Sequence, residues 1–185
     1  ISGPDGVPDG KIDSHDRTII GNPTPRYEFG LTLGLQWKGI DFSAFFQGVG
    51  KKDVYYSGAG ARALCGNYTI YKYQFDYWTP ENPDAKFPRL LEDPNATNPN
   101  NMISSFWVKS GAYCRLKNIV LGYTLPSSIT KTAHISKLRV YASAQNLFTI
   151  KDNFYEGFDP ENSVSSGASL YPLNKTFVFG LNVEF

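Results

Sequence analysis

The sequence predicts an all-β fold, an antiparallel transmembrane β-barrel segment of about five strands that forms part of a larger barrel. Apolar and polar residues alternate over stretches of about ten residues, which is the strand length that crosses a bilayer at a tilt. Aromatic residues make up 15% of the chain and charged residues 19%, a balance that suits amphipathic strands better than helices. Long and short connections also alternate along the chain, as in outer-membrane barrels.

Composition excludes several other classes. The 185 residues correspond to about one domain, and the net charge of +1 provides no basic field for nucleic acid, so no nucleic-acid partner is expected. No run approaches the roughly 18 consecutive apolar residues of a transmembrane helix. Cys65 and Cys114 allow at most one disulfide, and the sequence leaves open whether they pair.

The first two predicted strands form a hairpin. Residues 1–25 are rich in Pro, Gly and Asp, which predicts a loop. From Tyr27 to Trp37, apolar and polar residues alternate without exception, which predicts a strand with one apolar face. Lys38-Gly39 then reads as a two-residue hairpin turn. The alternation resumes from Ile40 and can extend towards Tyr56.

The remaining strands follow a long insertion over residues 58–104, which lacks sustained alternation and is expected to be functional because of its length. The third predicted strand covers residues 107–124, with a bulge near Asn118 because Leu116 falls out of phase. After a short connection, the further predicted elements are a strand over 138–145, a loop over 151–173 and a strand over 176–185.

Five strands do not close a barrel, and their open edges would be unsatisfied in lipid. The chain is therefore predicted to be one piece of a larger barrel in a bacterial outer membrane. The long loops 1–25, 58–104 and 151–173 are predicted to be extracellular, and the short connections periplasmic.

A soluble β-sandwich carbohydrate-binding module is the alternative, since such a module also buries one face of each strand. The two readings differ in what covers the row from Phe177 to Phe185, which is hydrocarbon in a barrel and a second protein layer in a sandwich.

Seven short runs follow one another along the chain: Asp9–Asp13, Ile20–Pro23, Tyr77–Pro83, Arg115–Ile119, Leu121–Pro126, Gln145–Phe148 and Gly157–Glu161. Runs in this order are found at the C-terminal end of SusC/RagA-type TonB-dependent outer-membrane transporters, and the chain resembles that family over nearly its whole length.

The resemblance implies a barrel of the 22-stranded, plugged class. It also implies the partners of that family: a SusD-like surface lipoprotein, the TonB complex, outer-membrane lipid, the remaining barrel and plug segments, and oligosaccharide or peptide cargo. The TonB box and plug belong to an N-terminal part that this sequence is expected to lack, so the chain alone would transport nothing. An enzymatic activity is not expected, and Phe185 resembles the terminal aromatic of the outer-membrane assembly signal.

Two groups are candidate binding residues. Asp5, Asp9, Asp13 and Asp16 resemble an EF-hand loop and could hold Ca²⁺, the one cofactor considered, although Val7 stands where a ligand is expected. The alternative is a rigid Asp/Gly turn without metal.

The second group is a set of loop aromatics that could bind cargo or the lipoprotein, or could pack among themselves to hold the loop folded. Its members are Tyr71, Tyr73, Phe75, Tyr77 and Trp78.

Other polar residues give weaker signals. Arg139 is expected to face the barrel interior and to hydrogen bond within the wall. Asp159 and Glu161 could be read as a glycosidase carboxylate pair, but nothing in the sequence indicates the required separation or a raised pKa. His15 and His134 stand in no triad or metal-binding spacing.

Overall fold

The secondary structure is dominated by long strands. The computed structural model describes residues 6–57, 63–64, 69–91, 100, 102–152, 154, 159–161 and 173–185. The strands of this part are β1 (Tyr27–Trp37), β2 (Ile40–Gly50), β3 (Asp53–Tyr55), β4 (Val108–Ser110), β5 (Tyr113–Thr124), β6 (Lys137–Gln145), β7 (Thr149–Lys151) and β8 (Thr176–Glu184). The helical elements are α1 (Ser127–Thr130) and short 3-10 turns at Ser14–Asp16, Lys72–Phe75, Ser105–Trp107 and Lys131–Ala133.

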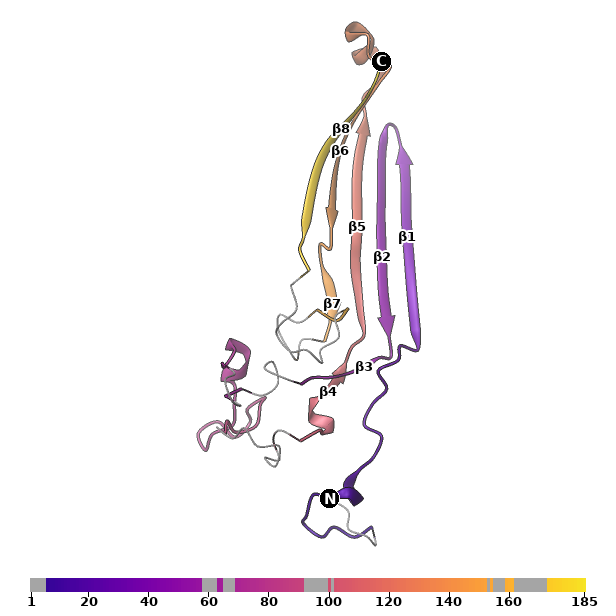
Figure 1. The fold of residues 1–185 in the computed structure, drawn as a ribbon. Coiled ribbons are helices and arrows are strands. Elements are labelled where there is room, and N and C mark those ends of the chain that lie inside the picture. Colours follow the sequence, from indigo (N-terminus) through magenta and orange to yellow (C-terminus); the bar gives the residue numbers. More distant parts are fainter. Residues whose placement is uncertain are drawn as a thin grey trace.

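Most of the strands form one antiparallel sheet in the order β1-β2-β5-β6-β8, with β7 also pairing with β5. Figure 1 shows a single layer. The β1–β2 turn, α1 and the C-terminus lie at one end, here called the turn end. The described parts of the segments before β1, between β3 and β4 and after β7 lie at the opposite end, here called the loop end. As far as they are described, the three long segments therefore lie at one end of the sheet, as the alternation of connections predicts; that this end is extracellular stays a prediction.

The β1–β2 hairpin confirms the sequence prediction. The strands pair without a break from Tyr27 opposite Gly50 to Trp37 opposite Ile40. Lys38 and Gly39 have φ angles of 45° and 86°, the two positive values of a type I′ turn. A Cβ at Gly39 would lie 2.7 Å from the Thr124 carbonyl oxygen, so this position requires glycine for space as well as for φ.

A bulge in β5 lies one residue from its predicted position. The pairing of β2 with β5 passes from Phe45 opposite Asn118 to Phe46 opposite Leu116, so Lys117 has no partner on β2. The extra residue brings Leu116 back to the same face as Ile119. The bulge therefore explains the change of phase in the sequence.

The predicted strand extensions exist but are interrupted. β2 ends before Lys51, whose φ is 50°, and the chain resumes as β3. β3 pairs with β4 in a separate two-stranded ribbon, and the Gly111 amide donates to the Lys52 carbonyl at 2.7 Å beside the break. A lysine in the left-handed region is uncommon and carries no periodic signal, so the alternation alone could not reveal this break.

The connection between β5 and β6 folds as α1 and a 3-10 turn. It closes the turn end, where the Leu125 amide donates to the Leu138 carbonyl at 2.9 Å and the Ser136 amide to the Glu184 carbonyl at 2.8 Å. Within the described ranges, no helix is long and apolar enough to cross a membrane.

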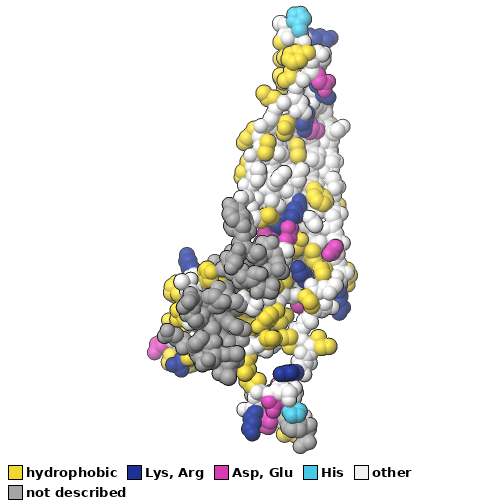
Figure 2. All heavy atoms as spheres, viewed as in Figure 1, with side chains coloured by type: hydrophobic (Ala, Val, Ile, Leu, Met, Phe, Trp, Pro, Cys, Tyr) yellow, Lys and Arg dark blue, Asp and Glu magenta, His cyan; other side chains and the backbone are white. Residues whose placement is uncertain are grey.

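The two faces of the sheet differ in chemistry. On the apolar face, Leu35, Trp37, Phe179 and Phe185 remain 62%, 61%, 81% and 91% exposed, so no second layer formed by the described residues covers them. This observation contradicts the β-sandwich alternative, which needs a covered face. Figure 2 shows basic and acidic side chains next to one another along the strands, in agreement with the ion pairs described below.

Candidate functional site at the loop end

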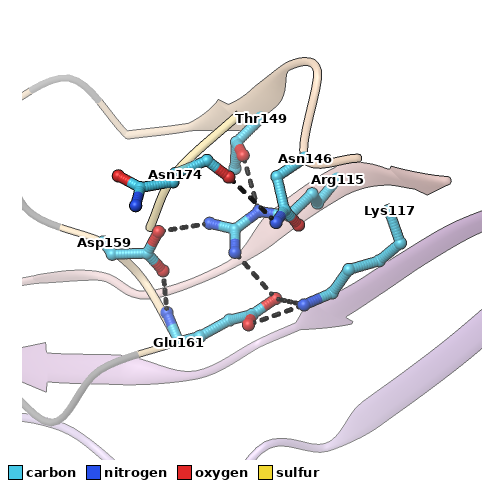
Figure 3. A network of polar contacts seen from close by, with 7 residues as sticks. All are labelled: Arg115, Lys117, Asn146, Thr149, Asp159, Glu161 and Asn174. Carbon is cyan, nitrogen blue, oxygen red and sulfur yellow. Dashed lines mark hydrogen bonds and ion pairs between the residues drawn. The ribbon is translucent and has the colours of Figure 1, made fainter. Parts of the chain in front are cut away.

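A charged network joins the sheet to the segment that follows β7 (Figure 3). Its centre is Arg115 on β5, which is only 2% exposed. Arg115 Nε donates to Thr149 Oγ1 on β7 at 2.7 Å, and Nη2 donates to Asp159 Oδ2 at 2.6 Å. Its Nη1 lies 3.1 Å from Glu161 Oε1. One guanidinium group thus holds two strands and one loop segment together.

Three further contacts complete this arrangement, here called the Arg115 latch. Lys117, the bulge residue, places Nζ 2.7 Å from Glu161 Oε1. The Glu161 amide donates to Asp159 Oδ1 at 2.9 Å, which fixes the turn between the two acids. The Asn146 side-chain amide donates to the Asn174 carbonyl at 3.2 Å, which ties the start of β8 to the same region. Two cations thus face two anions, and the charges of the latch balance.

A second ion pair lies on the same face towards the turn end. Arg139 on β6 donates to Asp41 on β2 through Nε at 2.8 Å and through Nη2 at 2.5 Å. On the intervening strand β5, Gly122 stands opposite Asp41 while Arg139 stands opposite Thr124, so the Arg139 side chain reaches Asp41 diagonally across the glycine. The inward-facing Arg139 therefore makes a wall contact, as expected from the sequence.

Aromatic side chains form a second cluster at the loop end. Phe87 and Trp107, which are 4% and 5% exposed, are its centre. The Trp107 indole nitrogen donates to the Asn100 carbonyl at 3.0 Å, which satisfies its buried N–H group. Half-buried aromatics pack around this centre: Tyr55, Tyr56, Tyr73, Tyr77, Phe106 and Phe154. The cluster joins β3, the long insertion and the segment after β7.

The structure divides the predicted aromatic group. Tyr73 and Tyr77 pack into the cluster, and Tyr71 stacks on Tyr73 with ring centroids 5.7 Å apart. Burial raises the pKa of the Tyr73 hydroxyl, so this group stays protonated at physiological pH. Phe75 and Trp78 instead remain 63% and 39% exposed. Only these two of the five present a large part of their surface for binding.

The structure describes three of the four predicted calcium ligands, Asp9, Asp13 and Asp16. Asp5 lies outside the described residues. Asp13 accepts a hydrogen bond from the His15 amide at 2.8 Å, and this bond lowers the pKa of the Asp13 carboxyl group. Asp16 accepts from the Asp13 amide at 2.9 Å, so both acids cap a 3-10 turn. Asp9, Asp13 and Asp16 form no metal-binding group within the described residues, and calcium binding stays a prediction.

The remaining candidates from the sequence are the cysteines, Phe185 and the acidic pair Asp159 and Glu161. The Cys114 thiol is free, while Cys65 lies outside the described residues. Phe185 stands exposed at the turn end, and its assembly role stays a prediction. Asp159 and Glu161 are held by Arg115 and Lys117 rather than standing as an acid and nucleophile pair.

Sequence reasoning missed the Arg115 latch, although both of its halves lie in runs that carry the family resemblance. The partners are 44 residues apart, and no periodic pattern connects a strand residue with an acid in a distant loop. The latch contains no reactive group that is free to act as a nucleophile or base. Its geometry positions a loop over the wall of the sheet.

A one-layer sheet with an exposed apolar face, balanced charges on the opposite face and anchored loops at one end defines the class of protein. The chain is a segment of a membrane β-barrel wall.

Comparison with known proteins identifies the family. No model of a protein family matches the chain. It is 34% identical over 193 residues to TonB-dependent receptor P3 of Formosa agariphila, an alignment covering 95% of this chain and 18% of the relative. It is 30% identical over 178 residues to TonB-dependent receptor SusC of Bacteroides thetaiotaomicron, covering 95% of this chain and 17% of that protein.

A solved structure of the RagAB peptide importer in the open-open state agrees, with a TM-score of 0.71 and 28% identity over 98% of this chain and 19% of the matched one. The chain belongs to the SusC/RagA-type TonB-dependent receptors, which are outer-membrane proteins of Gram-negative bacteria. It spans less than a fifth of the length of the curated relatives reported above. These relatives are receptors and importers rather than enzymes.

Proposed function

We propose that the protein to which this segment belongs imports oligomeric nutrients, either glycans or peptides, across the outer membrane in a TonB-dependent process. The observation that carries the proposal is the uncovered apolar face, which suits a wall in contact with lipid. In this proposal the segment supplies part of the wall and the base of the outer loops. In this proposal the plug and the segment that contacts the TonB complex belong to the rest of the protein, and the TonB complex is a separate partner that supplies the energy.

The loop end supports a second element of the proposal, a surface lipoprotein of the SusD type as partner. Phe75 and Trp78 project from a loop whose other aromatics are packed into a cluster. Exposed aromatics on a supported loop are typical anchors of a protein interface. The Arg115 latch holds residues 159–161, and Phe154 of the same segment packs against Phe87 of this loop.

Uptake measurements test the import function. Cells lacking the gene are compared with complemented cells for uptake of fluorescent oligosaccharides and oligopeptides, with and without TonB. We expect uptake of at least one of these two cargo classes, lost on deletion of either gene. Equal uptake in all strains would contradict the proposal, and the cargo that is imported decides between glycan and peptide.

Co-purification tests the lipoprotein interface. The double variant Phe75→Ala/Trp78→Ala should reduce recovery of the lipoprotein with the full-length receptor, because it removes two exposed anchors. Ile19→Ala is the matched control, since Ile19 is 93% exposed but lies in another loop segment. Unchanged recovery in the double variant would exclude this loop as the interface without affecting the import proposal.

A further inference from the structure

The apolar face contains a hollow of about 440 Å³. Its apolar side chains come from four strands and are Ile40, Leu121, Tyr123, Val140, Ala142 and Phe179. All six lie on the face that points away from the charged pairs. The hollow therefore opens towards the hydrocarbon of the membrane.

Differences in side-chain length create the hollow. Leu121, Ala142 and Phe179 stand opposite one another on β5, β6 and β8. Leu121 and Phe179 are 55% and 81% exposed and project outward on either side of the short alanine. Because β6 has β5 on one side and β8 on the other, the floor and both walls belong to this chain. The result is a groove over β6, between Leu121 and Phe179.

Polar groups stand where the groove approaches the turn end. Tyr123, Ile40 and Trp37 lie in one row across β5, β2 and β1. The Lys38 ammonium lies 4.9 Å from the centroid of the Trp37 ring, so it is held at the outer surface. A Cβ at Gly39 would be 3.4 Å from Tyr123 Cε2, which shows that the Tyr123 ring packs against the same turn. The Tyr123 side chain thus lines the groove towards the turn end, and the Lys38 ammonium lies beyond it, over Trp37 at the β1–β2 turn.

The charges at this end favour an anionic occupant. Asp41 is paired with Arg139 on the opposite face, and Glu184 is paired with Lys137. Lys38 forms no ion pair among the residues that the structure describes. The acidic side chains described at this end, Asp41 and Glu184, are both paired, so they leave no acidic side chain for the Lys38 of a second copy. A membrane lipid supplies both an apolar chain and a phosphate.

We propose that this groove is a binding site for a glycerophospholipid. One acyl chain lies along β6 over Ala142, between Leu121 and Phe179. The phosphate accepts hydrogen bonds from the Lys38 ammonium and the Tyr123 hydroxyl. This site holds one lipid in a fixed place, in contrast to the exchanging lipids that surround the rest of the wall, and it is independent of the imported cargo.

Native mass spectrometry of the full-length receptor in detergent, with phosphatidylglycerol as the probe, tests the site. Wild-type protein should retain one tightly bound lipid. Ala142→Phe fills the groove and should weaken its retention by about tenfold, because the acyl chain loses its close contacts. Leu31→Phe adds bulk at an outward position of β1 outside the groove and should retain the lipid like wild type.

A second variant tests the head-group contact without changing the groove. Lys38→Gln should lower affinity for phosphatidylglycerol about fivefold, while affinity for the zwitterionic phosphatidylcholine changes less. Heat-modifiable migration in electrophoresis confirms that each variant forms a barrel. Retention by Ala142→Phe equal to that of wild type would overturn the proposal. So would a groove that is protected only in a dimer of receptors.

Discussion

Gly122 allows a charged contact to pass over a strand. Asp41 and Arg139 come from β2 and β6, which are separated by β5, and their side chains meet directly above the glycine. A Cβ at this position would lie 2.5 Å from both Arg139 Nη2 and Asp41 Oδ1. The absence of a side chain at one residue thus permits a three-strand connection. Sequence reasoning placed Arg139 on the inner face but could not identify its partner 98 residues away.

The first prediction follows from this close approach. Gly122→Ala should force the two charges apart and lower the stability of the full-length barrel by about 1–3 kcal/mol, as overpacking does elsewhere. The measurement is the shift of the urea midpoint in detergent. Gly34→Ala is the control, because a Cβ there meets nothing within 4 Å. Similar losses in both variants would mean that backbone effects, and not the ion pair, determine the result.

Arg115 gives a second prediction at the same scale. Arg115→Met removes a buried cation and leaves Asp159 and Glu161 without it, which should cost about 3–5 kcal/mol of the free energy that holds their segment on the wall. Limited proteolysis of intact cells should then cleave near residues 159–161 about a hundredfold faster or more, because every 1.4 kcal/mol raises the open population roughly tenfold. Arg17→Met, a change on the exposed loop before β1, should leave the cleavage rate unchanged. A rate equal to that of wild type in Arg115→Met would show that the latch does not hold the loop.

At the scale of elements, period-two alternation was sufficient to predict each strand that has one face in contact with lipid. The β1–β2 hairpin, β8 and the bulge beside Asn118 all follow from it, because the face of each residue is fixed by its position in the strand. The alternation did not predict the strand breaks at Lys51 and Asn146. Both residues adopt a left-handed backbone conformation although neither is glycine. The fold of the loop end could not be predicted from the sequence either, because it depends on aromatic and charged contacts between distant segments.

β8 carries a prediction of its own. The outward row of this strand leads to Phe185 at the turn end, and we expect this aromatic to act in outer-membrane assembly. Phe185→Ala in the full-length protein should lower outer-membrane abundance several-fold, measured by immunoblotting of membrane fractions. Phe177→Ala removes an outward aromatic at the other end of the same strand and serves as the control. Normal abundance of Phe185→Ala would remove the assembly role.

The whole molecule is a wall whose stability depends on what borders it. Its apolar face is uncovered, and β1 and β8 are edge strands of the sheet in this chain. Unpaired strand edges cannot remain in lipid, so the neighbouring strands of the receptor must complete the hydrogen bonding. The opposite face carries paired charges and does not face the lipid. The two faces should therefore respond very differently to an added charge.

The final prediction compares neighbouring residues of β1, which point to opposite faces. Leu33→Lys places a charge in the hydrocarbon near the middle of the strand and should destabilise the full-length barrel by about 2–4 kcal/mol. Thr32→Lys places the same charge on the inner face and should cost much less. Urea unfolding in lipid vesicles measures both. If the two substitutions cost the same, or Thr32→Lys costs more, then the apolar row of this sheet does not face the membrane.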